Sequence, residues 1–309
     1  MKPSARITVI ASVLLLVCLA ASAIVLRKID SLRTGATLEE VLYITSPTAL
    51  KRLSLGYEGL LADVYWTRAV QYFGRNYEKG TGQYTLLAPL LELTTALDPQ
   101  LIVAYEYGAN FLATKPPNGA GMPERAVQLA EFGIRNNPNN WRLYYDLGFI
   151  DYMELKDYRQ AEEAFRRGSA VPGAHPWLKL MAALMAEHAG DLSTARLLWT
   201  ATYQTTNDRQ VRANAAAHLR ALQVDEDVPI LESLVSQYRA RTGHAPQSFA
   251  ELETAGMIRG TPRDPLGHSY KLTPDGGVEV RDPDDLPFIQ KGVPQGYAPP
   301  AKPKILPLE

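Results

Sequence analysis

Three prolines divide the middle of this chain into segments that are all rich in small and apolar residues. Pro99, Pro138 and Pro172 each follow a run of small and apolar residues and precede another such run. Proline lacks a backbone N–H and clashes with the preceding turn, so it ends a helix rather than continuing it. A pair of helices cannot bury its apolar face alone, so these repeated runs predict helical hairpins that stack on one another.

An uncharged segment near the N-terminus is the second strong constraint. Ile7 to Leu26 comprises 20 residues without a charge and has basic residues on both sides. A helix of this length is about 30 Å long, which matches the hydrocarbon core of a bilayer. We therefore expect residues 1–33 to form a basic segment and a transmembrane anchor. A cleaved signal peptide is the alternative, because Ala21-Ser22-Ala23 fits the small-residue pattern of cleavage sites.

Both interpretations of this segment place the following residues on the same side of the membrane. A signal peptide, or an anchor whose N-terminus stays in the cytoplasm, delivers the rest of the chain to the outside. Because basic residues flank both ends of the segment, charge asymmetry adds little to this assignment. We expect a single-pass protein of the bacterial inner membrane with its body on the periplasmic side.

Composition and motifs argue against several classes of function. The chain has 32 lysines and arginines against 33 acidic residues, so no basic field favours nucleic acid as a partner. The single cysteine, Cys18, lies in the apolar segment, which excludes an internal disulfide framework and a cysteine-based zinc site. No histidine lies three or four residues from another histidine or from the cysteine, and common catalytic motifs are absent. We expect no cofactor, no metal and no catalytic activity.

Apolar residues recur at intervals of three and four from residue 46 to about residue 261, which predicts helices throughout. Ser46-Pro47 provides an N-cap followed by proline at the first helical position. Helices are expected over residues 62–73, 84–97, 101–114, 123–136, 141–155, 158–169, 177–189 and 192–205, with loops at 74–83 and 115–121. Two further helices, 208–223 and 227–242, are expected to cap the stack, the second with Asp227 as its N-cap.

The third hairpin resembles a tetratricopeptide repeat, a unit of about 34 residues with large and small residues at fixed positions. The matching residues are Tyr144, Leu147, Gly148, Ala161, Phe165, Gly168 and Pro172, with the second helix displaced by about one residue. The resemblance is good over residues 101–205 and weaker over 60–99, where the units carry extra residues in their turns. It implies an all-α, TPR-like helical-hairpin solenoid over residues 46–225.

The same resemblance implies a concave groove lined by fixed positions of the first helix of each unit. Carried over to this chain, those positions are Arg68, Gln71, Glu106, Asn110, Arg142, Tyr145, Phe149, Tyr152 and Lys179. The set is mixed in charge and lacks the full pattern of lysine and asparagine that clamps a terminal carboxylate. We therefore expect an internal peptide segment or a folded protein as the partner. Packing or plain solvation is the competing explanation for each of these residues.

Residues 226–309 differ from the helical hairpins before them, because they include a predicted β-hairpin and a proline-rich tail. Residues 226–282 are expected to hold capping helices and a β-hairpin of 270–272 with 278–280 around a turn-forming cluster. About 40 residues are similar to the periplasmic end of type II secretion major pseudopilins, although the chain lacks the prepilin cleavage signature. The residues that carry this similarity are Thr242-Gly243, Pro246, Phe249, Leu252, Arg263-Asp264-Pro265-Leu266-Gly267 and Tyr270. Residues 283–309 are rich in proline and are expected to form an extended tail.

Acidic residues gather in the C-terminal loops: Asp264, Asp275, Asp282, Asp284 and Asp285. The pseudopilin resemblance implies that such loops can bind calcium, which needs six to eight converging oxygens. Aspartate also stabilises turns by accepting hydrogen bonds from nearby backbone groups. We favour the role in turns and assign no metal ligand.

These observations predict a membrane-anchored scaffold that mediates protein–protein interaction in assembly of an envelope or secretion-related complex. Two alternatives stay open. A permanent structural subunit of a larger membrane complex would expose broad apolar faces, particularly around residues 86–93. An enzyme would need a site built from distant residues, marked by a deep polar pocket and shifted acid or base groups.

Overall fold

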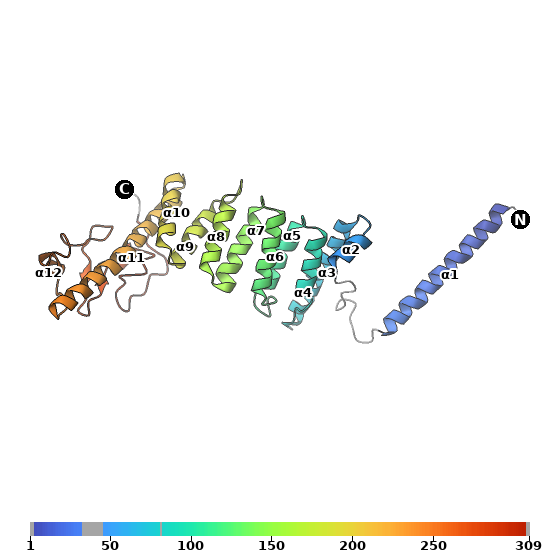
Figure 1. Ribbon diagram of the computed structural model, residues 1–309, viewed down its shortest axis with the longest axis horizontal. Helices are drawn as coiled ribbons and strands as arrows, with labels where there is room; N and C mark the ends of the chain where they lie inside the picture. The colour runs from blue at the N-terminus through green and yellow to red at the C-terminus, as the bar shows by residue number, and fades with distance from the viewer. Residues whose placement is uncertain (1–2, 33–45, 81, 307–309) are drawn as a thin grey trace. The chain divides into compact units, whose positions relative to one another are not determined.

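α-Helices make up most of the described chain, as the apolar period predicts (Figure 1). The computed structural model describes residues 3–32, 46–80 and 82–306. The chain consists of two compact units, a first unit, Met1–Arg125, and a second unit, Ala126–Glu309. The two units are described separately below.

Helix α1 spans Pro3–Leu32 and includes the whole uncharged segment. The side chains of residues 12–25 are exposed to solvent. The predicted segment 1–33 coincides with α1 except for residues 1, 2 and 33, which lie outside the described residues. Among the side chains that the structure describes, no helix combines the length and the apolar character that crossing a membrane requires.

The first unit continues with α2 (Pro47–Leu53), α3 (Glu58–Lys79), α4 (Leu87–Leu97) and α5 (Ile102–Ala113). The predicted start of α2 is confirmed, because the side chain of Ser46 accepts a hydrogen bond from the Ala49 N–H. The prediction of a loop over residues 74–83 is wrong, because α3 continues to Lys79. Gly74 alone does not stop the helix, whereas Gly80 ends it in the left-handed conformation, with φ of 61°.

Leucines of α4 form much of the core of the first unit. Leu87, Leu90, Leu91 and Leu93 are all buried. The stretch 86–93 therefore does not present the broad apolar face that a permanent structural subunit was expected to show there.

The second unit contains a row of short antiparallel helices, which follow one another along the chain in Figure 1. Helix α6 (Pro123–Asn136) begins just before the boundary, and α7 (Trp141–Ile150) continues into a π-helical turn, η1 (Asp151–Leu155). Helices α8 (Tyr158–Ser169), α9 (Trp177–His188) and α10 (Leu192–Thr205) follow, each packed against the one before it. Asp157 and Asp191 cap α8 and α10 through their side chains, which accept hydrogen bonds from backbone N–H groups of the first turn.

One interaction recurs in both units at the prolines that end the helices. The hydroxyl of Tyr105 donates to the carbonyl of Pro99 at 3.2 Å. The hydroxyl of Tyr144 donates to the carbonyl of Pro138 at 3.1 Å. In each case the tyrosine lies six residues after the proline, so two segments of the chain use the same local arrangement.

Small residues allow close contact between the helices of the second unit. A Cβ atom on Gly148 of α7 would lie 2.7–2.9 Å from atoms of the Phe165 ring of α8. A Cβ atom on Gly168 would lie 2.6 Å from Leu178 and 2.7 Å from Tyr144. Such distances are shorter than side chains tolerate, so both positions require glycine unless the helices move apart.

Helix α11 (Arg209–Thr242) differs from the prediction of two capping helices. Asp208 caps it through hydrogen bonds from the Gln210 and Val211 N–H groups. Asp227, the predicted second N-cap, lies inside the helix. The helix passes through Pro229 because it packs along its length, with Leu222 in one apolar cluster and Val228 in the next. It therefore crosses the boundary that the sequence predicts near residue 226.

The C-terminal module packs against the second half of α11. It contains α12 (Phe249–Thr254) and two antiparallel strands, β1 (Lys271–Leu272) and β2 (Val278–Glu279), paired as Lys271 with Glu279 and Leu272 with Val278. The predicted β-hairpin is thus confirmed, with shorter strands. A short 3-10 helix, η2 (Pro283–Asp285), precedes Leu286, which is buried in the same core. The chain beyond residue 282 is therefore packed at first rather than extended throughout.

The contact at Gly148 leads to the first prediction. Gly148→Ala should reduce the free energy of unfolding by about 1–3 kcal/mol, because the added methyl group overpacks the contact with Phe165. The measurement is thermal and urea unfolding of the full chain followed by circular dichroism. Gly59→Ala in α3 is the matched control, because a Cβ atom there meets nothing within 4 Å. Equal stability of the two variants would contradict the assigned close contact.

Candidate functional site: an aromatic surface on α7 and α9

A continuous row of rings joins α7, η1, the first residue of α8 and α9. We call it the aromatic surface, and it consists of Trp141, Tyr145, Phe149, Tyr152, Tyr158, Trp177 and His188. Phe149 stacks on Trp177 with centroids 5.7 Å apart and planes 13° apart. Tyr145 contacts both of these rings, with centroids 4.7 Å from Phe149 and 5.9 Å from Trp177. These contacts join α7 to α9 through their side chains.

Helical spacing explains why the rings of α7 and η1 align. Trp141, Tyr145, Phe149 and Tyr152 follow one another at intervals of four, four and three residues, which places them on one helical face. The π-helical turn of η1 accommodates one residue more than an α-helical turn. Tyr152 stays in the row, 6.3 Å from Phe149 between centroids.

The rings are partly exposed and firmly supported from below. Trp177 is 37% exposed, and the four rings of α7 and η1 are half-buried. Phe165 lies beneath Phe149, edge to face at 5.4 Å between centroids, within a core that also includes Leu178 and Met181. Rings held in this way lose little conformational freedom when a ligand binds, which favours recognition.

Two exposed cations lie over rings of the row. The guanidinium carbon of Arg142 lies 4.7 Å from the centroid of Trp141, and the Lys156 ammonium lies 5.7 Å from the centroid of Tyr152. Asp146 and Glu154 of the same segment are half-buried, and Asp157, which follows Lys156, is exposed. The charge around this surface is therefore mixed.

The structure places four of the residues predicted to line a groove near one another. Tyr145, Phe149 and Tyr152 lie in the aromatic surface, and Arg142 lies at its edge. Lys179 is exposed, but it follows Trp177 by two residues and so points to nearly the opposite side of α9.

The remaining predicted groove residues belong to the first unit. The guanidinium of Arg68 lies 5.9 Å from the centroid of Tyr65, and Asn110 donates to the carbonyl of Glu106 at 2.7 Å. Gln71 is exposed. In the first unit, Phe73 stacks on Phe111 at 3.9 Å between centroids, which joins α3 to α5.

Sequence reasoning missed Trp141, Trp177, Tyr158 and His188. The interval of four residues between Trp141 and Tyr145 is a signal that could have identified the first of them. Trp177 and His188 share a face of α9, but only packing against α7 and η1 shows that they join the same row.

A buried ionisable pair lies elsewhere in the second unit. His218 of α11 and Glu187 of α9 are 4% and 7% exposed, and Nδ1 of His218 lies 3.0 Å from both carboxylate oxygens. The indole N–H of Trp199 donates to Oε1 of Glu187 at 2.5 Å. The His218 ring stacks between Trp199 and Phe288, with centroids 4.1 and 4.0 Å away. Both faces of the imidazole are thus covered.

This pair forms part of the attachment of the C-terminal segment. Phe288 adopts a φ of 76°, which residues other than glycine rarely adopt, and stacks on His218 there. Nearby, Oδ1 of Asp225 accepts hydrogen bonds from the N–H groups of Gln290 and Lys291 at 2.8 and 2.7 Å. Burial raises the pKa of Asp225, and the negative charge of Glu187 adds to this effect. The arrangement ties residues 288–291 to α11 and is suited to stability.

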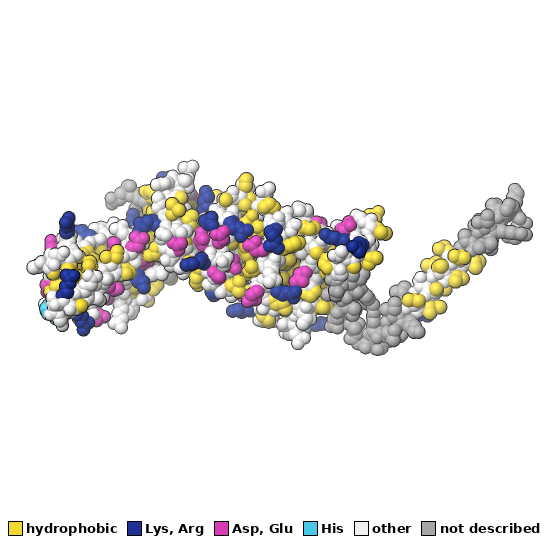
Figure 2. Space-filling view, in the orientation of Figure 1, with side chains coloured by type: hydrophobic (Ala, Val, Ile, Leu, Met, Phe, Trp, Pro, Cys, Tyr) yellow, Lys and Arg dark blue, Asp and Glu magenta, His cyan; other side chains and the backbone are white. Residues whose placement is uncertain are grey.

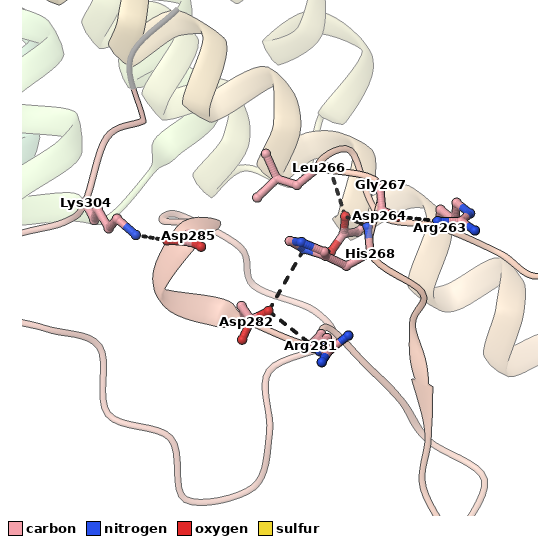
Figure 3. Close-up of polar contacts among 9 residues, drawn as sticks. All are labelled: Arg263, Asp264, Leu266, Gly267, His268, Arg281, Asp282, Asp285 and Lys304. Carbon is pink, nitrogen blue, oxygen red and sulfur yellow. Dashed lines mark hydrogen bonds and ion pairs between the residues drawn. The ribbon is translucent and has the colours of Figure 1, made fainter.

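Figure 3 shows the acidic loops of the C-terminal module. Oδ1 of Asp264 accepts hydrogen bonds from the Leu266 and His268 N–H groups, both at 2.9 Å. Nδ1 of His268 lies 3.7 Å from Oδ2 of Asp264 and 4.0 Å from Oδ2 of Asp282. Asp285 pairs with Lys304.

Turn formation thus accounts for Asp264, and for Asp275, whose pKa is lowered by a hydrogen bond from Thr273. Among the described residues, no group of three or more histidine, cysteine, aspartate or glutamate side chains is arranged to hold a metal ion.

Asp151, the first residue of η1, is a buried acid next to the aromatic surface. It is 4% exposed. Burial raises the pKa of Asp151 to about 7, and the negative charges of Asp157 and Glu131 add to this effect. An ionised carboxylate at this position therefore destabilises the turn that carries Tyr152.

No protein-family model matches this chain, and no curated protein matches it either. The resemblances to tetratricopeptide repeats and to pseudopilins stay predictions from the sequence. A functional proposal must therefore rest on the residues of this chain and their geometry.

Removal of His218 should destabilise the second unit. His218→Leu leaves the buried Glu187 carboxylate without the imidazole that contacts both of its oxygens, and loss of a hydrogen-bond partner at a buried polar group typically costs about 1–3 kcal/mol. Urea unfolding should show this loss, and limited proteolysis should cut the chain near residues 288–291 more rapidly. His244→Leu, at an exposed position, is the control. Unchanged stability of His218→Leu would show that the pair does not hold these segments together.

Asp151→Asn should stabilise the protein at pH 8 and have little effect at pH 4. A folded-state pKa of about 7 lies above the unfolded value, so the native state binds the proton more tightly. Stability of the parent chain therefore falls as the pH rises from about 4 to 7 and stays reduced above that. We expect a gain of about 1 kcal/mol or more at pH 8, after allowance for solvent screening.

Urea unfolding at pH 4, 6 and 8 measures this dependence. Asp63→Asn, at an exposed position of α3, should show no comparable change with pH. A constant difference between Asp151→Asn and the parent across this range would contradict the assigned titration.

Proposed function

We propose that this chain is a membrane-anchored helical scaffold that holds a protein partner on its aromatic surface. The complex that it serves is an envelope or secretion-related assembly, and the role involves binding without turnover. The observation that carries the proposal is the row of partly exposed rings that Phe165 and its neighbours support. Tryptophan and tyrosine are enriched among residues that dominate binding energy, because they offer a large rigid area with few rotatable bonds.

The repeated hairpins support a TPR-like solenoid as the architecture of this scaffold. The pairs Tyr105–Pro99 and Tyr144–Pro138 repeat one interaction in two segments of the chain. Gly148 and Gly168 provide the close contacts that the small positions of such repeats require. In a solenoid each hairpin contacts mainly its neighbours, which leaves a continuous side of first helices for a partner.

The anchor is proposed from the sequence of α1. Ile7 to Leu26 contains no charge and has the length of a membrane span. In this proposal α1 crosses the bacterial inner membrane once and the body lies in the periplasm. Confinement of scaffold and partner to one membrane raises their effective concentration, so modest affinity at the aromatic surface is sufficient.

The distribution of charge favours a protein partner over nucleic acid. Figure 2 shows basic and acidic side chains interspersed among apolar ones on the visible face of the described chain. The formal net charge of the chain is −1. Binding to a phosphate backbone depends on a clustered basic surface, for which this mixture gives no support.

Tyr145→Ala combined with Trp177→Ala should abolish capture of the partner and leave the helix content unchanged. Loss of two anchoring rings typically weakens binding by more than about 2 kcal/mol, a factor of about 30. The measurement is crosslinking and affinity purification of the full chain from its native membranes, with quantitative mass spectrometry of the captured proteins.

Tyr203→Ala is the control for this experiment, because Tyr203 of α10 is 37% exposed, the same fraction as Trp177. A partner that is retained by the control and lost by the double variant supports the proposal. Equal capture by the parent, the control and the double variant would contradict it.

A permanent structural subunit is the second candidate, and one observation favours it. Leu53, Leu55, Tyr57 and Leu60, around the turn between α2 and α3, are 64–85% exposed. Leu55 also adopts a φ of 51°, an unusual conformation for leucine. In this case a partner would stay bound in stoichiometric amounts despite the ring substitutions, and Leu55→Ser with Leu60→Ser would release it.

A further inference from the structure

A second exposed surface lies in the first unit, around the turn that joins α2 to α3. We call it the apolar patch, and it consists of Leu53, Leu55, Tyr57, Leu60 and Val64, which are 45–85% exposed. We propose that the apolar patch contacts the lipid bilayer that α1 enters, at the level of the headgroups and the first part of the acyl chains. This inference rests on the part of the proposed function that places α1 in the membrane.

The patch faces away from the core of the first unit. Tyr57, Leu60 and Val64 recur at intervals of three and four residues, so they share one side of the start of α3. The buried residues of the same part of the helix, Ala62 and Tyr65, lie on another side. Packing of α3 against α4 uses the buried side and leaves the patch exposed. Exposed apolar surfaces of this kind mark contacts with proteins or membranes.

Leu55 gives the clearest indication of an apolar surrounding. It is 85% exposed and adopts a φ of 51°, in the left-handed region that is unfavourable for a leucine. The turn is nevertheless ordered, since the Tyr57 N–H donates to the carbonyl of Ser54 at 2.9 Å, and the Ser54 hydroxyl donates to the carbonyl of Lys51 at 2.7 Å. A leucine held in this way gains little from packing within the chain. Contact with an apolar phase outside the chain would offset both costs.

The position of the patch in the chain favours lipid as its occupant. Residues 33–46 separate the end of α1 at Leu32 from Pro47, the first residue of α2. Fifteen steps of chain span at most about 55 Å, so α2 stays within that distance of the end of α1 whatever path the chain takes between them. With α1 in the bilayer, this tether confines the patch to the neighbourhood of the lipid surface, and a weak apolar contact is then sufficient.

The side chains of the patch also suit the boundary between lipid and water. Leu53 and Leu55 project from the end of a helix and from the turn that follows it. Acyl chains adapt to such a protrusion, whereas a protein partner needs a complementary surface. Tyr57 is 69% exposed, and tyrosine is enriched at the level of the headgroups because its ring is apolar and its hydroxyl is polar.

Charge contributes little to this contact. The charged residues around the patch are Lys51, Arg52 and Asp63, which are exposed, and Glu58 and Arg68, which are half-buried. The charge is thus mixed. The two cations of α2 can keep their charged ends among the headgroups while their aliphatic parts lie along apolar surface. We therefore expect the patch to bind neutral as well as anionic lipid, with apolar contact as the main source of affinity.

Site-specific fluorophores test the inference with the full chain reconstituted into phosphatidylcholine vesicles. Cys18 is the single cysteine, so an environment-sensitive label on the parent chain reports on α1. The label is moved to the patch with Cys18→Ser and Leu55→Cys, and to α10 with Cys18→Ser and Leu197→Cys. Leu197 is 69% exposed, so it provides a control at an exposed apolar residue outside the patch. Lipids that carry a nitroxide quencher near the headgroup or deep in the acyl chain report the depth of each label.

We expect a different result from each of the three labels. The label on Cys18 should be quenched most strongly by the deep nitroxide. The label at position 55 should lose about half of its fluorescence to the shallow nitroxide, because interfacial side chains lie about 5–10 Å into the boundary of headgroups and acyl chains. The label at position 197 should be quenched by neither. Vesicles that also contain anionic phosphatidylglycerol should give the same pattern.

Substitutions in the rest of the patch show whether the contact belongs to the patch or to the label. Leu53→Ser with Leu60→Ser should remove the quenching at position 55 and leave the quenching at Cys18 unchanged. Leu197→Ser with Ile230→Ser replaces two apolar residues that are 69% and 60% exposed, and it should change neither. Circular dichroism confirms that each variant is folded.

Each other outcome overturns the inference in a distinct way. If Cys18 is quenched and position 55 is not, the patch does not contact lipid, and anchoring by α1 stands. If position 55 is also protected from a water-soluble thiol reagent in native membranes but not in vesicles, a protein covers the patch, as in a permanent structural subunit. If positions 55 and 197 are quenched equally, the contact is not specific to the patch. If neither Cys18 nor position 55 is quenched, both the inference and the proposed anchor are wrong.

Discussion

The close contact between Gly148 and the Phe165 ring is the constraint on which the structure around the aromatic surface depends. With a Cβ atom at Gly148 there would be no room for that ring beneath α7. Phe165 in turn supports Phe149, and Phe149 stacks on Trp177 of the next hairpin. A series of ring contacts therefore connects the buried contact at Gly148 to the partly exposed ring of Trp177. The same ring contacts stabilise the core and position the candidate binding residues, so the rings are in place before any partner binds.

Polar groups have a different role at the C-terminal side of the second unit. Glu187, His218 and Asp225 are buried, and each is hydrogen-bonded, since burial of unpaired polar groups costs several kcal/mol. Together with Trp199 and Phe288 they fasten the C-terminal segment to α9, α10 and α11. The aromatic rings and the buried polar groups thus have different roles within the second unit. Apolar rings are partly exposed on α7 and α9, whereas ionisable groups are buried where segments distant in the sequence meet.

Strong local signals account for what the sequence predicts well. Proline and capping aspartates define α6, α8 and α10 at the residues where the structure has them, because a missing N–H or a side-chain cap acts within one turn. Predictions fail where no such signal exists or where packing overrides it. Helix α3 passes through Gly74, and α11 continues through Asp227 and Pro229, since contacts along its length outweigh the local cost. At the candidate site, the intervals of four and three residues that separate Tyr145, Phe149 and Tyr152 show from the sequence that these rings share one helical face.

The sequence by itself determined that the chain forms short helical hairpins with tight turns, and that Tyr145, Phe149 and Tyr152 recur at helical spacing. Those properties follow from periodicity, glycine, proline and capping residues, all of which act over a few positions. Only the tertiary structure decided that Trp177 completes the row on α7, that Lys179 points away from it, and that His218 pairs with Glu187. These relations join residues about 30 positions apart, and they depend on the distance and rotation between packed helices, which local patterns do not specify.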